Sequence, residues 1–297
     1  MTRLCVAIPE DIVHRRSHET TRVRWNIIKV CRHSIHCFES IIGIWHALIS
    51  RKKIFWVGTM KMITAVDARR NHLLAELPDR LLNEWLPCFE NMELAAGKVI
   101  YEVGESLDHV YFPTDAVVSF VLSLEDGSVI EMAMIGSDGM VGVSAVLGSR
   151  TASGSAVVLV KGNSLRLSTD KILQNLANGS VVQTLLFRFT QALVAQIVQT
   201  SACSRRHSLE QQFCRWLLMV QDRLPSGDLK LTHESIASML GVRRESVTEV
   251  AIRLQAADII RYTRGRIVIR DRGRLELRAC ECYKFINRHY ASLFPPR

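Results

Sequence analysis

Residues 232 to 254 read THESIASMLGVRRESVTEVAIRL, a pattern of two short helices joined by a tight turn. Ala237 stands four residues before Gly241, so the helices can cross at a methyl group and turn at a residue that adopts positive φ without strain. Apolar residues at helical spacing would face the angle between the helices. They are Ile236, Leu240, Val242, Val247, Val250 and Leu254. The stretch therefore predicts a helix-turn-helix, with Thr232 as the N-cap of the first helix.

The second of these helices carries polar side chains around its N-terminal turns. This end of a recognition helix is the part that reaches base edges in the major groove of DNA. The residues at or near it are Arg243, Arg244, Glu245, Ser246 and Glu249. Double-stranded DNA is the predicted partner, and the alternative is an ordinary helical hairpin in an α-rich core.

Two short β-prone runs follow the helix-turn-helix. Residues 259–262 and 266–269 are joined through Thr263-Arg264-Gly265, which predicts a strand hairpin beside the recognition helix. Arg264 and Arg266 near its tip would lie over phosphate, where charge supplies affinity and position but little sequence information. Residues 207–297 are therefore predicted to form a winged helix-turn-helix domain.

The net charge of +9 is distributed unevenly along the 297 residues. Residues 1–61 hold 11 basic and 4 acidic side chains, residues 62–202 hold 9 and 15, and residues 203–297 hold 18 and 10. An acidic middle joined to a basic C-terminal part indicates that the C-terminal part contacts a polyanion and that the middle has another role.

From Leu94 to Leu167 the pattern changes to short β-prone runs separated by glycine. Such a pattern is typical of a β-barrel or jelly roll, which either holds one small ligand or fills its interior with side chains. Asp126-Gly127 predicts a hairpin, because both residues tolerate positive φ. We expect a sensor barrel over residues 62–180. The predicted strands are residues 99–101, 110–112, 116–122, 129–135, 155–160 and 165–167.

A long helix is predicted over residues 181–206. Its apolar stripe, which must be buried against something, consists of Leu185, Phe189, Leu193 and Ile197 or Val198. The barrel of the same chain would cover it. A matching helix of a second subunit is the better explanation, because two-fold symmetry would also place two recognition helices about one DNA turn apart. The predicted fold class is α+β: an N-terminal sensor barrel, a dimerisation helix and a C-terminal winged helix-turn-helix.

Taken together, these features resemble the Crp/Fnr family of transcription regulators over about residues 75–290. The resemblance is most specific in the helix-turn-helix and the wing. The segments that carry it are Gly104-Glu105, Asp126-Gly127, residues 231–247 and residues 264–269.

The resemblance implies roles for single residues. In the family an arginine and the following glutamate read bases and the adjacent hydroxyl meets phosphate, and these match Arg244, Glu245 and Ser246. A guanidinium donates two hydrogen bonds to guanine and a carboxylate accepts one from cytosine, so the pair suits a G·C step. We expect phosphate contacts from Arg243, Arg264 and Arg266. RNA polymerase is a further candidate partner.

The sequence also departs from the family. Glu249 stands where members that respond to cyclic AMP carry a second base-reading arginine. Those members bind the nucleotide through a Phe-Gly-Glu run and a later Arg-Ser or Arg-Thr pair. In residues 139–144 and 154–156 valine replaces the glutamate and glycine the arginine. Because an unpaired buried phosphate costs several kcal/mol, this argues against cyclic AMP. Only Cys88 lies near the place of the iron-sulphur cluster of oxygen-sensing members, which argues against a cluster.

The eight cysteines do not form an extracellular framework, and no secretory signal precedes the folded part, so we expect a cytoplasmic protein. Cys280 and Cys282 lack the usual zinc spacing and would point apart on a helix, and they are predicted to be packing residues. Cys203 and Cys214 are also predicted to be packing residues. A metal site made by Cys31, His33, His36 and Cys37 would lack a second ligand set. The sequence therefore predicts no metal site.

Residues 1–61 are a basic extension, predicted to be poorly ordered or to precede the true start near Met60 and Met62. The alternative is an amphipathic segment that lies on a membrane or on DNA. No apolar run approaches the roughly 20 residues that span a bilayer, so no stable membrane insertion is expected.

The functional prediction is a homodimeric regulator that binds DNA sequence-specifically and whose barrel responds to an unknown effector. An enzyme is not predicted, because the sequence has no phosphate-binding glycine loop, no paired acids at catalytic spacing and no nucleophile motif. The alternative is a small-molecule sensor whose helix-turn-helix contacts protein. Glu249 keeps that alternative open, because an acid there repels phosphate.

Overall fold

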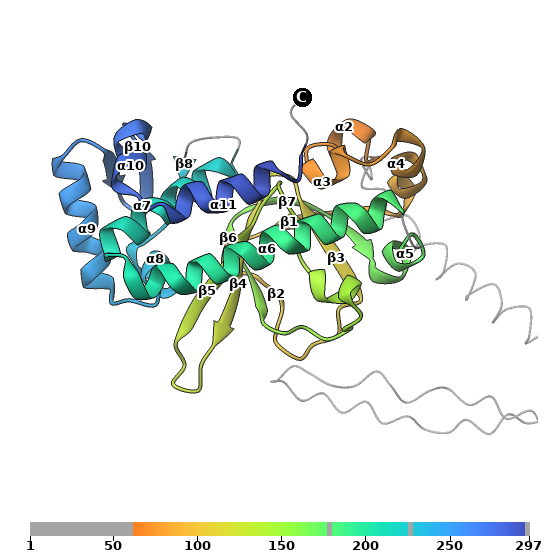
Figure 1. Ribbon diagram of the computed structural model, residues 1–297, viewed down its shortest axis with the longest axis horizontal. Helices are drawn as coiled ribbons and strands as arrows, with labels where there is room; N and C mark the ends of the chain where they lie inside the picture. Colours follow the sequence, from red (N-terminus) through yellow and green to blue (C-terminus); the bar gives the residue numbers. More distant parts are fainter. Residues whose placement is uncertain (1–61, 177–179, 225–227, 295–297) are drawn as a thin grey trace, which may run out of the picture. The chain divides into compact units, whose positions relative to one another are not determined.

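The computed structural model describes residues 62–176, 180–224 and 228–294. Along these residues the chain forms a β-domain, one long helix and a C-terminal helical module (Figure 1). The predictions for residues 1–61 and for the metal ligands Cys31, His33, His36 and Cys37 lie outside the described residues.

The β-domain begins with a short helical segment, which consists of α2 (Ala65–Ala68), α3 (His72–Ala75), α4 (Asp79–Trp85) and the 3-10 turn η1 (Leu86–Cys88). Asn71 caps α3 and is fully buried. Its side-chain amide donates to the carbonyl oxygens of Pro113 and Gly139, at 2.9 Å each. One polar side chain thus connects the helical segment to the end of β3 (His109–Pro113) and to the loop after β5 (Val129–Ile135).

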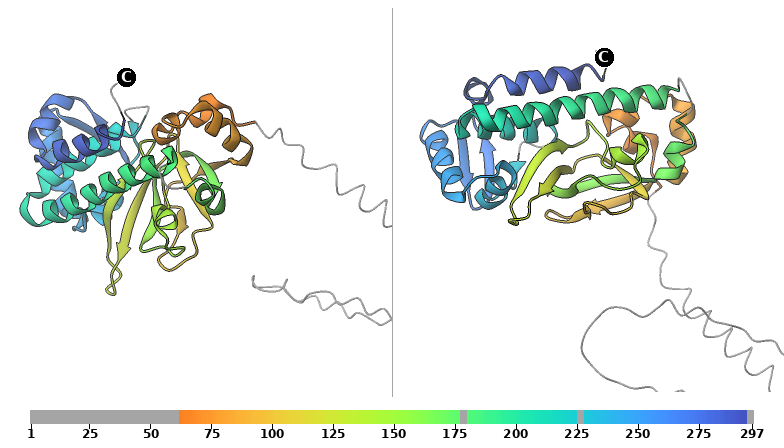
Figure 2. Two further views of the ribbon diagram at one scale, coloured as in Figure 1. Left: turned by 45° about the vertical axis from the view of Figure 1, so that its right-hand side comes forward. Right: turned by 60° about the horizontal axis from the view of Figure 1, so that its bottom comes forward.

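Two antiparallel sheets form the β-domain in the described residues, with strand orders β1-β7-β3 and β2-β6-β4-β5 (Figure 2). Six strands match the predicted runs. β1 was not predicted, because its sequence ENMEL is mostly exposed and lacks apolar alternation. It is held by its pairing with β7. The strands are β1 (Glu90–Leu94), β2 (Val99–Tyr101), β3 (His109–Pro113), β4 (Val117–Ser123), β5 (Val129–Ile135), β6 (Ser155–Val160) and β7 (Gly162–Ser168).

The predicted hairpin at Asp126-Gly127 connects β4 and β5, but only one of its two residues adopts the positive φ that both were expected to tolerate. Gly127 has φ 81°, whereas Asp126 does not enter the left-handed region. Asp126 instead accepts a hydrogen bond from the backbone N–H of Ser128 at 2.9 Å. The turn therefore depends on one glycine and one side-chain acceptor.

Helix α5 (Thr169–Leu173) follows β7, and the long helix α6 (Val181–Arg206) then packs along the β-domain. The predicted apolar stripe is buried here by the chain's own barrel: Leu185, Phe189 and Leu193 are 8%, 0% and 6% exposed. Gly139 lies under the Phe189 ring so closely that a Cβ there would be 2.6 Å from it. The expectation that a second subunit covers this stripe is therefore wrong, because the barrel already fills that space. A different face of α6, with Phe187, Val194 and Val198, is exposed.

Among the described helices, α6 is long and apolar enough to cross a membrane by length and composition. The core helix of a soluble domain meets the same criteria, and 39% of the apolar stretch of α6 is buried inside this fold. Within this fold α6 packs against both α11 (Cys282–Ala291) and β5.

The C-terminal module starts with α7 (Leu209–Asp222), whose N-cap Ser208 forms a capping box with Gln211. Helix α11 returns along α6 (Figures 1 and 2). Neither α10 nor α11 was predicted. The remaining elements are β8 (Asp228–Leu229), α8 (His233–Leu240), α9 (Arg244–Ala256), β9 (Ile260–Thr263), β10 (Arg266–Ile269), α10 (Arg272–Arg278) and α11 (Cys282–Ala291), with the sheet order β8-β10-β9.

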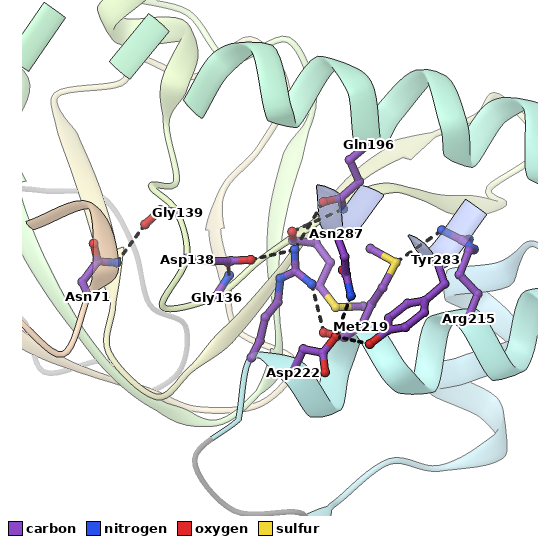
Figure 3. Close-up of polar contacts among 12 residues, drawn as sticks. Asn71, Gly136, Asp138, Gly139, Gln196, Arg215, Met219, Asp222, Tyr283 and Asn287 are labelled. Carbon is purple, nitrogen blue, oxygen red and sulfur yellow. Dashed lines mark hydrogen bonds and ion pairs between the residues drawn. The ribbon is translucent and has the colours of Figure 1, made fainter. Parts of the chain in front are cut away.

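A buried guanidinium joins the β-domain to this module. Arg223, directly after α7, has a side chain only 3% exposed and lies 2.8 Å from a carboxylate oxygen of Asp138 in the loop after β5. Figure 3 labels Asp138 and Met219 among the polar contacts of this region. Nη1 of Arg223 donates to the carbonyl of Met219 at 2.9 Å, and its Cζ lies 5.1 Å from the ring centre of Tyr290 on α11. Gly136 leaves room for the side chain, since a Cβ there would lie 2.7 Å from Cβ of Arg223.

We expect Asp138→Ala to lower the free energy of unfolding by about 3 kcal/mol, because removing one partner leaves a buried charge without compensation. Urea unfolding followed by circular dichroism measures the change. Glu84→Ala is the control, since Glu84 pairs with Arg80 at an exposed site and should cost less than about 1 kcal/mol. Equal effects of the two substitutions would show that the Arg223 pair does not stabilise the fold.

Candidate nucleic-acid interface

The helix-turn-helix has the predicted local geometry. Thr232 Oγ1 accepts a hydrogen bond from the N–H of Ser235 at 3.0 Å and caps α8. Gly241 ends α8 in the left-handed region, with φ 65° and ψ 37°, and the N–H of Val242 then donates to the carbonyl of Ala237 at 3.0 Å. Of the predicted inward residues, Ile236, Val247, Val250 and Leu254 are at most 1% exposed. Leu240 and Val242 are half-buried against the same core.

His233 joins α8 to α9 and to the wing, a role that the sequence did not predict. Its Nδ1 lies 2.9 Å from Oγ1 of Thr248 on α9, and its ring stacks on Tyr262 of β9 with centroids 3.9 Å apart. Burial lowers the pKa of His233, so the neutral imidazole is favoured. The contacts span 15 and 29 residues of sequence, so no local pattern could have revealed them.

The start of α9 is exposed. Arg243 is its N-cap residue, just outside the helix, and Arg244 is its first residue. Both arginines and Glu245 are exposed. Arg244 lies 4.0 Å from Glu234 with both side chains well over half exposed, a weak pair that leaves the guanidinium available for a ligand.

Ser246 and Glu249 lie further along the same helix, beside the start of α7. They line a shallow hollow together with residues 208–211. Ser246 is half-buried and Glu249 is exposed. The structure thus separates the predicted residues of α9 into an exposed leading pair, Arg244 and Glu245, and a flanking pair that faces α7.

The wing is a two-residue hairpin between β9 and β10, in which Thr263 pairs with Arg266. Arg264 and Gly265 form its turn with φ values of 45° and 77°, as such a tight hairpin requires. Its surface forms a groove whose lining carries four cationic side chains, from Lys230, Arg261, Arg264 and Arg266. This arrangement suits a polyanion.

The cationic wing and the exposed start of α9 meet at the first turn of α8. A Cβ at Gly265 would lie 3.6 Å from the side chain of Thr232, which places the wing tip beside the N-cap of α8. Arg244 approaches Glu234 in the same turn. The exposed start of α9 and the wing are therefore close neighbours and can contact one ligand together.

Strand β5 of the β-domain touches this module at two points. Glu131, 7% exposed, accepts hydrogen bonds from Trp216 Nε1 on α7 at 2.8 Å and from the hydroxyl of Ser119. Burial raises the pKa of Glu131 to about 7. Ile130 contacts the turn of the helix-turn-helix, since a Cβ at Gly241 would lie 3.4 Å from its Cγ1. A shift of β5 would thus move both α7 and the turn.

Comparisons with known proteins agree with this two-part organisation. A family model described as a Crp-like helix-turn-helix domain matches residues 211–278, and one described as a cyclic nucleotide-binding domain matches residues 91–178. No curated protein matches the chain in sequence.

Solved structures of bacterial regulators share the fold. FixK2 from Bradyrhizobium japonicum superposes with a TM-score of 0.57 and 18% identity, covering 65% of this chain and 98% of that chain. TTHB099, a CRP-family transcriptional regulator from Thermus thermophilus, has a TM-score of 0.53 and 22% identity, with coverages of 63% and 96%. TTHA1359, a CRP/FNR-family transcriptional regulator of the same organism, has a TM-score of 0.52 and 21% identity, covering 64% of this chain and 98% of that chain.

At the two positions that the family resemblance assigns to the nucleotide-binding arginine and glutamate, the β-domain carries glycine and valine. Gly154 stands where an arginine would be needed, and a Cβ there would already lie 2.7 Å from the ring of Phe120. Val143, in place of the glutamate, packs against the core, and Met140 and Val141 beside it are fully buried.

The titration of Glu131 gives a pH-dependent prediction. Because its pKa in the folded protein is about 7, above the ordinary value of 4.5, the folded state binds more protons than the unfolded state between these values. The stabilisation is complete below about pH 4.5 and is lost as the pH rises to about 7. The free energy of unfolding of the wild type, minus that of the Glu131→Gln variant, should therefore fall by on the order of 3 kcal/mol as the pH rises across this range.

Urea unfolding of both proteins at pH 5, 6, 7 and 8 measures this difference. The glutamine side chain keeps an acceptor for Trp216 and does not titrate, which makes Glu131→Gln the matched variant. A difference that stays constant from pH 5 to pH 8 would contradict the raised pKa.

Proposed function

Since the chain belongs to the Crp/Fnr family of transcription regulators, which are not enzymes, we propose that it is a homodimer that binds double-stranded DNA sequence-specifically. The observation that carries the proposal is the exposed start of α9, with Arg244 and Glu245, beside the cationic wing. A helix of this kind enters the major groove with its N-terminal residues toward the bases, while basic groups next to it contact phosphates.

The proposed roles follow from the chemistry of each side chain. Arg244 donates two hydrogen bonds to N7 and O6 of guanine, and Glu245 accepts one from the amino group of cytosine. Phosphate contacts come from Arg243, Ser246, Arg264 and Arg266. Glu249, one helical turn after Glu245, is an exposed acid that repels phosphate, and this disfavours half-sites that bring the backbone close to it.

A second copy of the chain is proposed to cover the exposed face of α6. Phe187, Val194 and Val198 are 54%, 47% and 62% exposed, and their spacing of seven and then four residues matches a helix-to-helix seam. Other faces of α6 are already covered by α11 and by the β-domain. Two-fold symmetry about this seam would set two copies of α9 one DNA turn apart.

The proposed effector acts on the β-domain, and it is not cyclic AMP, because Gly154 and Val143 supply neither the cation nor the carboxylate for that ligand. An effector can act only through its different affinity for two arrangements of the dimer. The contacts of Glu131 and Ile130 with α7 and the helix-turn-helix are the route by which β5 would bias those arrangements. We expect a cytoplasmic protein, and RNA polymerase stays a predicted partner.

Electrophoretic mobility shift of the full-length protein on genomic DNA fragments, at two salt concentrations, tests the proposal. We expect a subset of fragments to be shifted at both concentrations, and all fragments to be bound more weakly at the higher one. A protein that shifts no fragment even at low ionic strength would instead support the alternative, a sensor whose helix-turn-helix contacts protein.

Two substitutions separate base reading from phosphate binding. On a selected duplex Arg244→Ala should cost about 1 to 3 kcal/mol and relax the preference at one base pair. Arg264→Asn should weaken binding to every duplex alike and reduce the salt slope by about 1. Asparagine tolerates the positive φ at this position, so the turn of the wing is preserved. Fluorescence anisotropy on specific and scrambled duplexes measures both effects.

Arg244→Ala with unchanged affinity and discrimination would overturn the base-reading role. A defect of Arg264→Asn that is limited to one sequence would overturn the role of the wing.

The double substitution Val194→Glu and Val198→Glu should produce monomers, because it places two acids in each copy of the seam. Sedimentation velocity measures the association state, and anisotropy should show that specific DNA binding falls with it. Val66→Glu, at a more exposed apolar position on α2, is the control and should leave the dimer intact. A dimer that survives the double substitution would exclude this face of α6 as the interface.

A further inference from the structure

Four side chains that commonly bind metals converge where α6 ends and α11 begins. Cys203, His207, Cys280 and Cys282 each direct one ligand atom to a common centre, and these atoms all lie within 4.8 Å of one another. Sγ of Cys203 lies 3.5 Å from Sγ of Cys280, and Nδ1 of His207 lies 3.5 Å from Sγ of Cys282. The three thiols are buried and the imidazole is half-buried.

The expectation that Cys280 and Cys282 point apart on one helix is wrong. α10 ends at Arg278, and Ala279 leaves it in an extended conformation with φ −74° and ψ 154°. Cys280 therefore lies in the connection, and Cys282 is the first residue of α11. The other two ligands come from the end of α6, where Cys203 and His207 are four residues apart and so on one face.

The distances suit a tetrahedral ion. With Zn–S of about 2.3 Å and Zn–N of about 2.0 Å, tetrahedral geometry places two sulphur ligands about 3.8 Å apart and a sulphur and a nitrogen about 3.5 Å apart. The two contacts of 3.5 Å are within a few tenths of an ångström of these values. All four ligand atoms lie within 4.8 Å of one another, so the widest pairs would have to approach by only about 1 Å to complete the tetrahedron.

A second observation independently points to a metal. His207 directs Nδ1 at the cluster, while its Nε2 lies 3.2 Å from a carboxylate oxygen of Glu281. A histidine that binds a metal commonly donates its other N–H to a carboxylate in this way. Gln199 also donates from Nε2 to Sγ of Cys282, at 3.0 Å. Glu281 thus orients the imidazole of His207, and Gln199 stabilises a thiolate at Cys282.

We propose that Cys203, His207, Cys280 and Cys282 bind one Zn²⁺ ion in each chain. Three thiolates and one imidazole in a closed tetrahedron are a typical structural zinc set, and soft sulphur ligands disfavour magnesium, calcium and manganese. His207 is the residue at which α6 ends before α7 begins at Leu209. The ion therefore lies where α6 meets the C-terminal module, and it joins this point to the start of α11.

Zinc content of full-length protein, purified under reducing conditions and dialysed against a weak chelator, tests the site by inductively coupled plasma mass spectrometry. Wild type should retain about one zinc ion per chain. Cys282→Ser and His207→Ala should each lose most of it. Cys214→Ser removes a buried thiol outside the cluster, and Cys88→Ser removes an exposed one, so both should retain it.

Cobalt absorption provides a readout that does not depend on how well a variant folds during expression. Apo wild type titrated with Co²⁺ should develop the visible bands of a tetrahedral cobalt thiolate, and one equivalent of Zn²⁺ should abolish them. Cys280→Ser, checked for native circular dichroism, should show weaker bands.

Three results would overturn the proposal. The first is folded wild type that retains no zinc and gives no cobalt bands. The second is zinc retained equally by all four variants, which would place it elsewhere in the chain. The third is a disulfide between Cys203 and Cys280, found by mass spectrometry in protein purified under reducing conditions, which would make the cluster a redox pair.

Discussion

The burial of one guanidinium, that of Arg223, constrains how the β-domain and the C-terminal module fit together. A buried cation is tolerated only where its charge and its donors find partners, and these come from distant parts of the chain. Asp138 supplies the opposite charge, Met219 a carbonyl and Tyr290 an aromatic face. The adjacent hydrogen bond from Trp216 to Glu131 is a second polar contact across the same boundary. Since both contacts involve α7 or its end, the position of the helix-turn-helix depends on the conformation of the loop and strand at β5.

The helix-turn-helix, the wing and six strands could be predicted because their signals are local. A glycine at a positive φ, a hydroxyl at an N-cap and an apolar period each act within a few residues, as Thr232, Gly241 and Gly265 show. β1 could not be predicted, because its stability comes from pairing with β7. The partner of the α6 stripe was misassigned, since periodicity shows that Phe189 is buried but not against what. The exposed positions of Arg244 and Glu245 followed from the helix start, while the roles given to them rest on chemistry and family.

Sequence motifs are incomplete guides to both the β-domain and the cysteine cluster. In the β-domain the fold is recognisable but the ligand is not, and the cluster has no local motif at all. The β-domain matches the model of cyclic nucleotide-binding domains, yet the family resemblance assigns Gly154 and Val143 to the positions of the nucleotide-binding arginine and glutamate, so the fold alone does not identify the effector. The cluster has no recognisable zinc spacing, yet folding brings Cys203 and Cys280, 77 residues apart in sequence, to within 3.5 Å. Its place at the joint between α6 and α7 would let metal occupancy stiffen the start of α7, the helix whose Trp216 contacts Glu131 of β5.

Selection of bound duplexes from a random-sequence pool by the purified full-length protein is the sharpest test of DNA recognition by a symmetric dimer. Such a dimer should enrich a motif with two-fold symmetry, whose half-sites lie about one helical turn apart and each contain a G·C pair. Selection that enriches no motif, or a motif without symmetry, would contradict a dimer that presents two copies of α9 to successive major grooves.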